Sequence, residues 1–206
     1  SDLHVGDNGE PALDVFEGHG DLVALDHSAD ETVDYVVHVM SHWLDRGAAG
    51  WRLDAAYAVP SPFWARVLPQ VKAAHPYSWI FGEVIHGDYP RIIEESTMDS
   101  ITQYELWKSI QHALETENFF ELDWNLKRHN AFLDSFVPQT FIGNHDVTRI
   151  ASQIGPAKAA LALAVLMTVG GVPSIYYGDE QGKQYFLAEH EKTEMTLLSD
   201  DAALPD

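Results

Sequence analysis

The sequence predicts an α/β fold in which parallel strands alternate with helices. Short apolar segments typical of strands, each ending in polar residues, occur at 50–58, 78–88, 139–146 and 172–182. Segments with helical periodicity lie between them, and short turns separate the elements, as in strands joined by helical crossovers. Asp54 and Glu83 are 29 residues apart, the length of one strand-helix-strand step, and Glu83 and Asp146 are 63 apart, about two such steps.

The first elements follow from capping and periodicity. Residues 1–25 are rich in Gly, Asp and His without sustained periodicity, which predicts a loop. Ser28, with Glu31 three residues later, is typical of a helix N-terminus. Apolar residues then recur at helical spacing up to Gly47: Val33, Val36, Val37, Met40, Trp43 and Leu44. The stretch GWRLDAAYA, from Gly50, follows as the first strand.

The next helix begins at Ser61-Pro62 and presents an apolar face, and we expect Pro69 to kink or interrupt it. The stretch SWIFGEVIHGD forms the second strand and runs into a polar loop. A weaker helical segment around 90–96 precedes the stretch 100–114, which is predicted to begin as a strand and continue as a helix.

The C-terminal elements repeat the pattern. QTFIGNHD at 139–146 is a strand with a polar end, 157–169 is a helix, and VPSIYYGDEQG is the fourth clear strand. The tail after Gly182 is mostly polar and has no clear strand. We therefore expect a loop at 1–25, a strand-and-helix body at 26–182 and an extension at 183–206.

The composition is that of a globular protein. The chain has 206 residues, 46% of them hydrophobic, which is enough for one substantial core or two small ones. Its 12 Lys and Arg against 32 Asp and Glu give a formal charge of −20, which would repel phosphate backbones and anionic membrane surfaces. We therefore expect neither a nucleic-acid nor a membrane partner. The absence of cysteine excludes disulfides and thiolate metal sites.

The termini and the most apolar run bear on localisation. The run at 159–169 is shorter than the about 18 residues of a membrane span, which predicts a core helix. The first residues show neither the basic start nor the apolar stretch of a signal peptide. These features favour a soluble, cytoplasmic protein over a secreted one. Because the chain starts with Ser1 and not with Met, we expect an incomplete chain from which a targeting segment could have been left out.

Arg52 and Asp54 stand at alternate positions of an apolar segment, so on a strand they share one face. Charge inside a buried element requires pairing, and Arg52 is placed to hold the Asp54 carboxylate ionised. One interpretation is a structural ion pair at a strand end. The other is a carboxylate kept as a nucleophile or electrostatic stabiliser, and this spacing alone does not decide between them.

Asp54, Glu83 and Asp146 each end an apolar strand and precede a loop. The carboxyl ends of parallel strands form the catalytic face of a (β/α)8 barrel, and an open doubly wound sheet follows a similar rule. Glycoside hydrolysis needs two such acids, one ionised and one protonated. Any one of them is more often a helix cap or the partner of an arginine such as Arg52 or Arg149, but three at strand-repeat spacing favour a site.

Four stretches, in order, resemble the α-amylase family of glycoside hydrolases. GWRLDAAYAV is similar to its fourth-strand motif, FGEVIHGD to its fifth, FIGNHDVTRI to its seventh and GVPSIYYGDEQG to its eighth. The resemblance covers residues 50–182. It implies a (β/α)8 TIM-barrel fold, incomplete here, with strands four to eight present.

The resemblance also implies roles for single residues. Asp54 would be the nucleophile, Glu83 the acid and base, and Asp146 the third catalytic acid of a retaining enzyme acting on α-glucosidic bonds. The substrate, an α-glucan or related oligosaccharide, would be bound by other residues: Arg52, Tyr57, Asn144, His145 and Arg149. Retention requires the two reacting carboxyls to lie about 5–5.5 Å apart.

The surroundings of the two acids fit these roles. Arg52 keeps the nucleophile charged. Glu83 follows the apolar stretch Trp79-Ile80-Phe81 with no cation adjacent in sequence, so its protonated form is favoured.

The chain departs from the family pattern at two places that concern metal binding. Tyr57 and Ala58 replace the family's frequent Lys-His after the nucleophile, and Ala24 stands where a calcium-binding Asp is usual. We therefore predict no metal site and no cofactor.

The family's third-strand motif, an Asp followed by Asn-His, is absent. Five strands cannot close an eight-stranded barrel, so we expect a fragment of a longer enzyme that self-associates through open barrel edges, which size-exclusion chromatography would test. Two alternatives remain open at this point, a transglycosylase of the same family and a non-catalytic carbohydrate-binding fragment.

Overall fold

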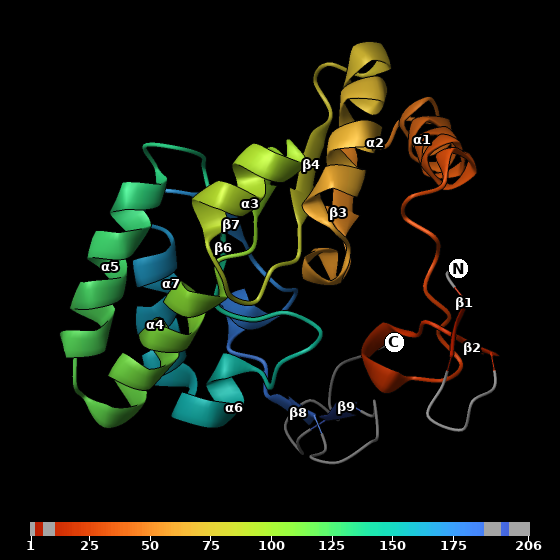
Figure 1. Ribbon diagram of the computed structural model, residues 1–206. Helices are drawn as coiled ribbons and strands as arrows, with labels where there is room; N and C mark the ends of the chain where they lie inside the picture. Colours follow the sequence, from red (N-terminus) through yellow and green to blue (C-terminus); the bar gives the residue numbers. More distant parts are fainter. Residues whose placement is uncertain (1–2, 6–10, 188–194, 198–206) are drawn as a thin grey trace. The chain divides into compact units, whose positions relative to one another are not determined.

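The structure, a computed structural model, describes residues 3–5, 11–187 and 195–197 (Figure 1). The chain divides into two compact units. The first comprises Ser1–Glu83 and Arg91–Asp99, and the second comprises Val84–Pro90 and Ser100–Asp206. Within each unit, parallel strands alternate with helices, which confirms the predicted α/β class.

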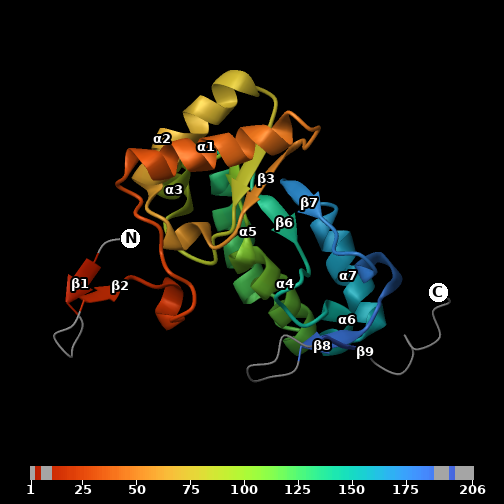
Figure 2. The ribbon, with the colours of Figure 1, turned by 90° about the vertical axis from the view of Figure 1, so that its right-hand side faces the viewer.

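The first unit is built on a strand-helix-strand step. Its main elements are α1 (Asp30–Leu44), β3 (Gly50–Leu53), α2 (Ser61–Ala74) and β4 (Trp79–Gly82). β3 and β4 are parallel, with Gly50 opposite Trp79 and Leu53 opposite Gly82. A Cβ at Gly50 would collide with the backbone of Trp79, so the close approach of the two strands requires glycine there. α1 packs beside α2 (Figures 1 and 2).

The apolar faces predicted for the two helices are buried. Val33, Met40 and Leu44 of α1 and Val67 and Val71 of α2 are less than one tenth exposed. Burying these side chains removes apolar surface from water, which is the main term that stabilises short helices.

Two local expectations about these helices are wrong. α1 begins at Asp30 with Ala29 as its N-cap, and Ser28 instead bonds the Asp26 carboxylate through its backbone N–H (2.9 Å) and its hydroxyl (2.6 Å). α2 continues through Pro69 without a break. Proline removes one backbone hydrogen bond from the helix, and the buried apolar face on both sides of it offsets that loss.

The ends of the chain contain short elements that the sequence did not predict. In the segment expected to be loop lie β1 (Leu3–Val5), antiparallel to β2 (Pro11–Leu13), and a 3-10 turn η1 (Phe16–Gly18). In the C-terminal extension, β8 (Tyr185–Leu187) pairs antiparallel with β9 (Met195–Leu197). Each is only three residues long, too short for a periodic pattern to emerge. Residues 1–2, 6–10, 188–194 and 198–206 lie outside the described part.

Among its described residues, the second unit contains the remaining strands and four complete α-helices. The first two residues of α3 (Tyr89–Ser96) belong to the second unit and the others to the first. The remaining elements are β5 (Ser100–Ile101), α4 (Tyr104–Thr116), α5 (Phe120–Phe132), β6 (Gln139–Phe141), α6 (Ile150–Ile154), α7 (Pro156–Leu166), β7 (Val172–Ser174) and the 3-10 turn η3 (Asp179–Gln181). β6 and β7 are parallel, and Thr102 forms a parallel bridge with Gln139 on the other side of β6.

The core of this unit lies between α4, α6 and α7, whose buried side chains include Leu106, Ile110 and Leu166. The predicted helix at 157–169 is α7, which ends three residues earlier than expected; Gly155, with a positive φ of 81°, separates it from α6, and Pro156 occupies its first turn. One side of its apolar run, with Ala159, Ala162 and Leu166, packs in the core as expected, whereas Leu161 and Met167 are more than half exposed. None of the helices in the described ranges combines the length and the apolarity that crossing a bilayer requires.

A buried histidine ties three elements of the second unit together. His129 of α5 is fully buried, and its Nε2–H donates to the carbonyl of Gly170 before β7 (2.6 Å). Its Nδ1 then accepts from the amide of Gln103 (3.4 Å), whose oxygen is already occupied in capping α4 at the Leu106 N–H. A proton on Nδ1 would face that amide N–H. Burial is the main cause that lowers the pKa of His129, and the Gly170 carbonyl opposes it.

We expect the free energy of unfolding to fall as the pH drops below about 6.5, the ordinary histidine value. In that range unfolded His129 binds a proton that the folded protein excludes, so the unfolded state gains stability on acidification. His129→Gln should flatten this slope, measured by urea unfolding between pH 7 and pH 5. The exposed His86 offers the control substitution to Gln. Equal slopes in all three proteins would contradict the assignment.

Candidate active site

The register of β3 and β4 brings Asp54 and Glu83 to one level of the sheet. Leu53 lies opposite Gly82, and the N–H of Glu83 donates to the carbonyl of Leu53 (2.8 Å). Both acids therefore leave the carboxyl ends of adjacent parallel strands, which is where catalytic groups gather in α/β folds.

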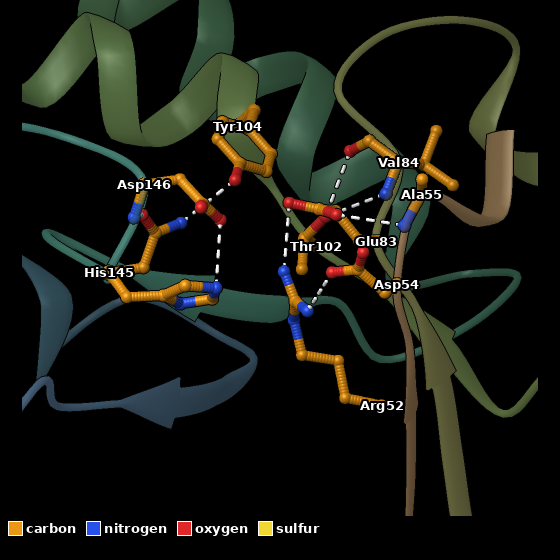
Figure 3. A network of polar contacts seen from close by, with 10 residues as sticks. Arg52, Asp54, Ala55, Glu83, Val84, Thr102, Tyr104, His145 and Asp146 are labelled. Atoms are coloured by element: carbon orange, nitrogen blue, oxygen red, sulfur yellow. Dashed lines mark hydrogen bonds and ion pairs between the residues drawn. The ribbon is translucent and has the colours of Figure 1, made fainter. Parts of the chain in front are cut away.

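One arginine joins the two acids. The Nη1 of Arg52 lies 2.5 Å from Oδ1 of Asp54, and its Nη2 lies 2.9 Å from Oε1 of Glu83 (Figure 3). Glu83 therefore has a cation beside it in the structure, although none is adjacent to it in sequence. Adjacency along the sequence did not reveal this contact, because the strand pairing carries Glu83 to the arginine. The fork of the guanidinium suits two carboxylates at once.

The two carboxyls differ in exposure. The side chain of Asp54 is 77% exposed and that of Glu83 is 10% exposed. Oε2 of Glu83 also accepts a hydrogen bond from the backbone N–H of Ala55 (3.0 Å) (Figure 3). Ala55 has φ 43° and ψ 39°, a left-handed conformation that is costly for a residue with a Cβ and is often found at functional sites. Glu83 is thus fixed on both oxygens, whereas Asp54 faces solvent on most of its surface.

Tyr57 lies in the 3-10 turn η2 (Ala56–Ala58) that follows Asp54. Its hydroxyl donates to Oε1 of Glu17 (2.9 Å), and this hydrogen bond is the main cause that raises the pKa of Tyr57 to about 12. A cavity of about 280 Å³ lies beside this contact, within the first unit. Its walls are Val15, Phe16, Glu17, Ala24, Leu25, His27, Asp54, Ala55, Ala58 and Val59. Asp54 is therefore one of the residues that line this cavity.

The second unit holds the predicted Asn-His-Asp residues on the loop after β6. The amide of Asn144 donates to the hydroxyl of Tyr104 (2.8 Å), and its oxygen accepts from the N–H of Asp146 (2.9 Å). Nε2 of His145 lies 3.2 Å from Oδ2 of Asp146, and both side chains are about half exposed (Figure 3). The asparagine thus holds the loop, while the side chains of the histidine and the aspartate keep about half of their surface exposed to solvent.

Arg149, predicted to bind substrate, is placed differently. Its Nη1 donates to Oδ1 of Asp179 (2.8 Å), and each side chain is 1% exposed. Burial raises the pKa of Asp179 and outweighs the opposite effect of Arg149. Asp179 was not selected from the sequence, although it lies within the GDEQG stretch that carried the eighth-strand resemblance.

The structure therefore brings the predicted residues into two groups, Arg52, Asp54 and Glu83 in one unit and Asn144, His145 and Asp146 in the other. The sequence missed Ala55 because it acts through its backbone N–H, which leaves no trace in residue type. Within the described residues, no three carboxylate or imidazole side chains converge as metal ligands would.

Comparison with known families identifies the chain. The family described as alpha amylase, catalytic domain, matches residues 13–202. The chain belongs to the α-amylase family. This confirms the resemblance noted in the sequence, and it fits the position of Asp54 and Glu83 at strand ends.

Several α-amylase-family enzymes are similar in sequence. A cyclomaltodextrinase from Bacillus sp. is 30% identical over 85% of the chain, and neopullulanase 2 from Thermoactinomyces vulgaris is 32% identical over 74% of it. A cyclomaltodextrin glucanotransferase from Geobacillus stearothermophilus is 29% identical over 81% of it. The chain spans 33%, 27% and 25% of the lengths of these three relatives.

Solved structures show the same fold. A cyclomaltodextrinase superposes with a TM-score of 0.73 at 27% identity, covering 88% of this chain and 32% of that one. The α-amylase from H. orenii gives a TM-score of 0.73 at 24% identity, covering 85% and 39%. Together with the family match, these neighbours imply that the strands belong to a (β/α)8 barrel.

Proposed function

We propose that this chain carries the nucleophile and the acid of a retaining glycosidase that cleaves α-glucosidic bonds. The observation that supports this best is the guanidinium of Arg52, which joins the carboxyls of Asp54 and Glu83 at the ends of two paired parallel strands. Retaining glycosidases use two neighbouring acids in this way, one as nucleophile and one as acid and base. In this assignment β3 to β7 correspond to barrel strands four to eight.

In the first step, a carboxylate oxygen of Asp54 attacks the anomeric carbon of the sugar. The glycosidic C–O bond breaks, and the departing oxygen takes the proton of Glu83, so that a glycosyl ester and a carboxylate are left. The high exposure of Asp54 leaves it accessible to a sugar, and the contacts on both oxygens of Glu83 fix the direction from which the proton comes.

In the second step, Glu83 acts as a base. It takes a proton from water while the water oxygen attacks the anomeric carbon, and the ester bond to Asp54 breaks. Both acids return to their starting states. Two displacements at one carbon restore the α configuration, so the product keeps the anomeric form of the substrate.

The other predicted site residues have supporting roles in this proposal. Asp146 binds sugar hydroxyls and stabilises the positive charge that develops on the ring, and His145 contacts the same sugar. Asn144 holds the loop that carries them. Tyr57, whose hydroxyl bonds the cavity-lining Glu17, contacts substrate from the first unit. Arg149, which is buried, supports the site and does not touch the sugar.

The substrate class follows from the relatives. Their names refer to cyclomaltodextrins, pullulan-type polymers and glucan transfer, so the proposed substrate is an α-glucan or maltooligosaccharide. Transfer to a second sugar in place of water is the alternative, because the glucanotransferase is as similar to this chain as the hydrolases are.

To test this, the intact protein is incubated with a linear maltooligosaccharide and the products are analysed. Proton NMR recorded in the first minutes should show the α-anomer of the new reducing end before mutarotation, and chromatography should separate hydrolysis from transfer products. A fluorinated glucosyl fluoride, which slows the second step, should leave a covalent adduct on the peptide that contains Asp54, detected by mass spectrometry. First appearance of the β-anomer would exclude the double displacement. Sugar binding without any turnover would instead indicate a carbohydrate-binding protein.

A further inference from the structure

The loop Gly143–Arg149, between β6 and α6, carries Asn144, His145 and Asp146. Asn144 is held by Tyr104 and in turn holds the N–H of Asp146. These contacts fix the middle of the loop. The two ends of the loop, Gly143 and Arg149, are held by a different group.

Arg149 is fixed at the C-terminal end of the loop. Besides its hydrogen bond to Asp179 (2.8 Å), its guanidinium carbon lies 4.4 Å from the ring centre of Tyr176 and 4.7 Å from that of Tyr177. Cation–π contacts of this kind strengthen when they are removed from water, and the arginine side chain is 1% exposed. The residue also precedes α6 as its N-cap position, so its place sets where that helix starts.

Gly143 is fixed at the other end by the same carboxyl. A Cβ at Gly143 would lie 2.6 Å from Oδ2 of Asp179, so the carboxyl packs directly against the backbone there. One carboxyl therefore contacts both ends of the loop, its Oδ1 at Arg149 and its Oδ2 at Gly143. Because the Asp179 side chain is only 1% exposed, it cannot itself reach a sugar.

We propose that Asp179, through its ion pair with Arg149 and its contact with Gly143, is a positioning residue that holds His145 and Asp146 in their working geometry. The expected effect on catalysis rests on the proposed function, whereas the anchoring of the loop does not. A single anchor at the base of a loop closes it into a rigid arc, so the carboxylate and imidazole at its tip keep their direction without contact from the anchor.

An ion pair is a costly way to fill a buried site. Removing two charges from water costs several kcal/mol per ion, and apolar side chains of similar size often replace such pairs without loss of stability. A role in stability alone therefore does not require the charges. A role in fixing the loop does, because hydrogen bonds and charge set direction, whereas apolar packing does not.

The test separates these two roles with a double substitution. Arg149→Met combined with Asp179→Leu removes both charges and keeps the volume, and Asp179→Asn alone leaves the arginine without its counter-charge. Glu117→Gln is the matched control, because Glu117 pairs with Lys158 on the surface of the same unit (3.2 Å). Hydrogen–deuterium exchange, followed by mass spectrometry, reports the opening of the loop and of α4 separately.

We expect the double variant to fold and to keep the exchange of α4, while the loop exchanges at least about tenfold faster. Asp179→Asn should give the same loop signature, and Glu117→Gln should change neither segment. If the folded double variant leaves the loop as protected as in the unchanged protein, the positioning role is wrong. If the double variant does not fold, the exchange rates of the loop and of α4 are compared in Asp179→Asn. A loop as protected as in the unchanged protein would then show that the positioning role is wrong.

Activity adds a second readout. In a turning-over protein, kcat in the folded double variant should fall by roughly 10²-fold, while KM changes far less. A rise in KM with kcat unchanged would contradict a role in positioning the catalytic groups. If the unchanged protein shows no turnover, the proposed function fails, and the exchange experiment still tests the anchor by itself.

Discussion

Asp54→Asn and Glu83→Gln should each lower kcat on a maltooligosaccharide by about 10⁴-fold or more, because the nucleophile and the acid act in one covalent sequence. The amide of Asn cannot form the glycosyl ester, and the amide of Gln can neither donate the first proton nor accept the second. Both replacements are nearly isosteric, so the strands that carry them should stay paired as in the register of β3 with β4.

The two variants should also differ from one another. A glycosyl fluoride needs little proton donation to leave, so Glu83→Gln should retain far more of its first-step rate with the fluoride than with the oligosaccharide. Asp54→Asn should lose the first-step rate with both the fluoride and the oligosaccharide. Steady-state rates and the release of fluoride measure this, with circular dichroism to check the fold. Asp45→Asn, at an exposed carboxyl of the same unit, is the control. Near-normal rates in either active-site variant would contradict the proposed mechanism.

Replacing Arg52 should have the second largest effect. Its guanidinium contacts Asp54 and Glu83 together, so Arg52→Met leaves two neighbouring carboxyls without their shared cation. We expect kcat/KM to fall by about 10²- to 10³-fold, comparable to the loss of one well-placed hydrogen-bond donor in an active site. Arg52→Lys should recover only part of it, because an ammonium is a point charge and cannot hold two carboxyls in a fork.

The matched control for the Lys substitution is Arg91→Lys, since Arg91 forms an exposed pair with Glu95 one helical turn away. Such surface pairs contribute little, about 0–1 kcal/mol, so this variant should behave like the unchanged protein. Full activity of Arg52→Lys would show that only charge is needed at this position. Full activity of Arg52→Met would show that the arginine is structural.

Much of the architecture was predictable because it depends on local periodicity. The strands at 50–53, 79–82, 139–141 and 172–174 and the apolar face of α1 follow patterns that the residues themselves carry. α5 escaped prediction, and it buries four residues that include the polar Asn125 and His129. A helix that buries polar side chains has no clean apolar stripe, so its pattern is weak.

The sequence by itself determined the alternation of strands and helices, the family, and the positions along the chain of the three acids. These follow from residue type and spacing, which are properties of the chain alone. The tertiary structure alone decided that Arg52 serves Glu83 as well as Asp54, that the N–H of Ala55 reaches Glu83, and that Asp179 holds Arg149. Each of these contacts joins residues that strand pairing or loop closure brings together, and electrostatic and hydrogen-bond energies depend on distance in space, not on separation in sequence.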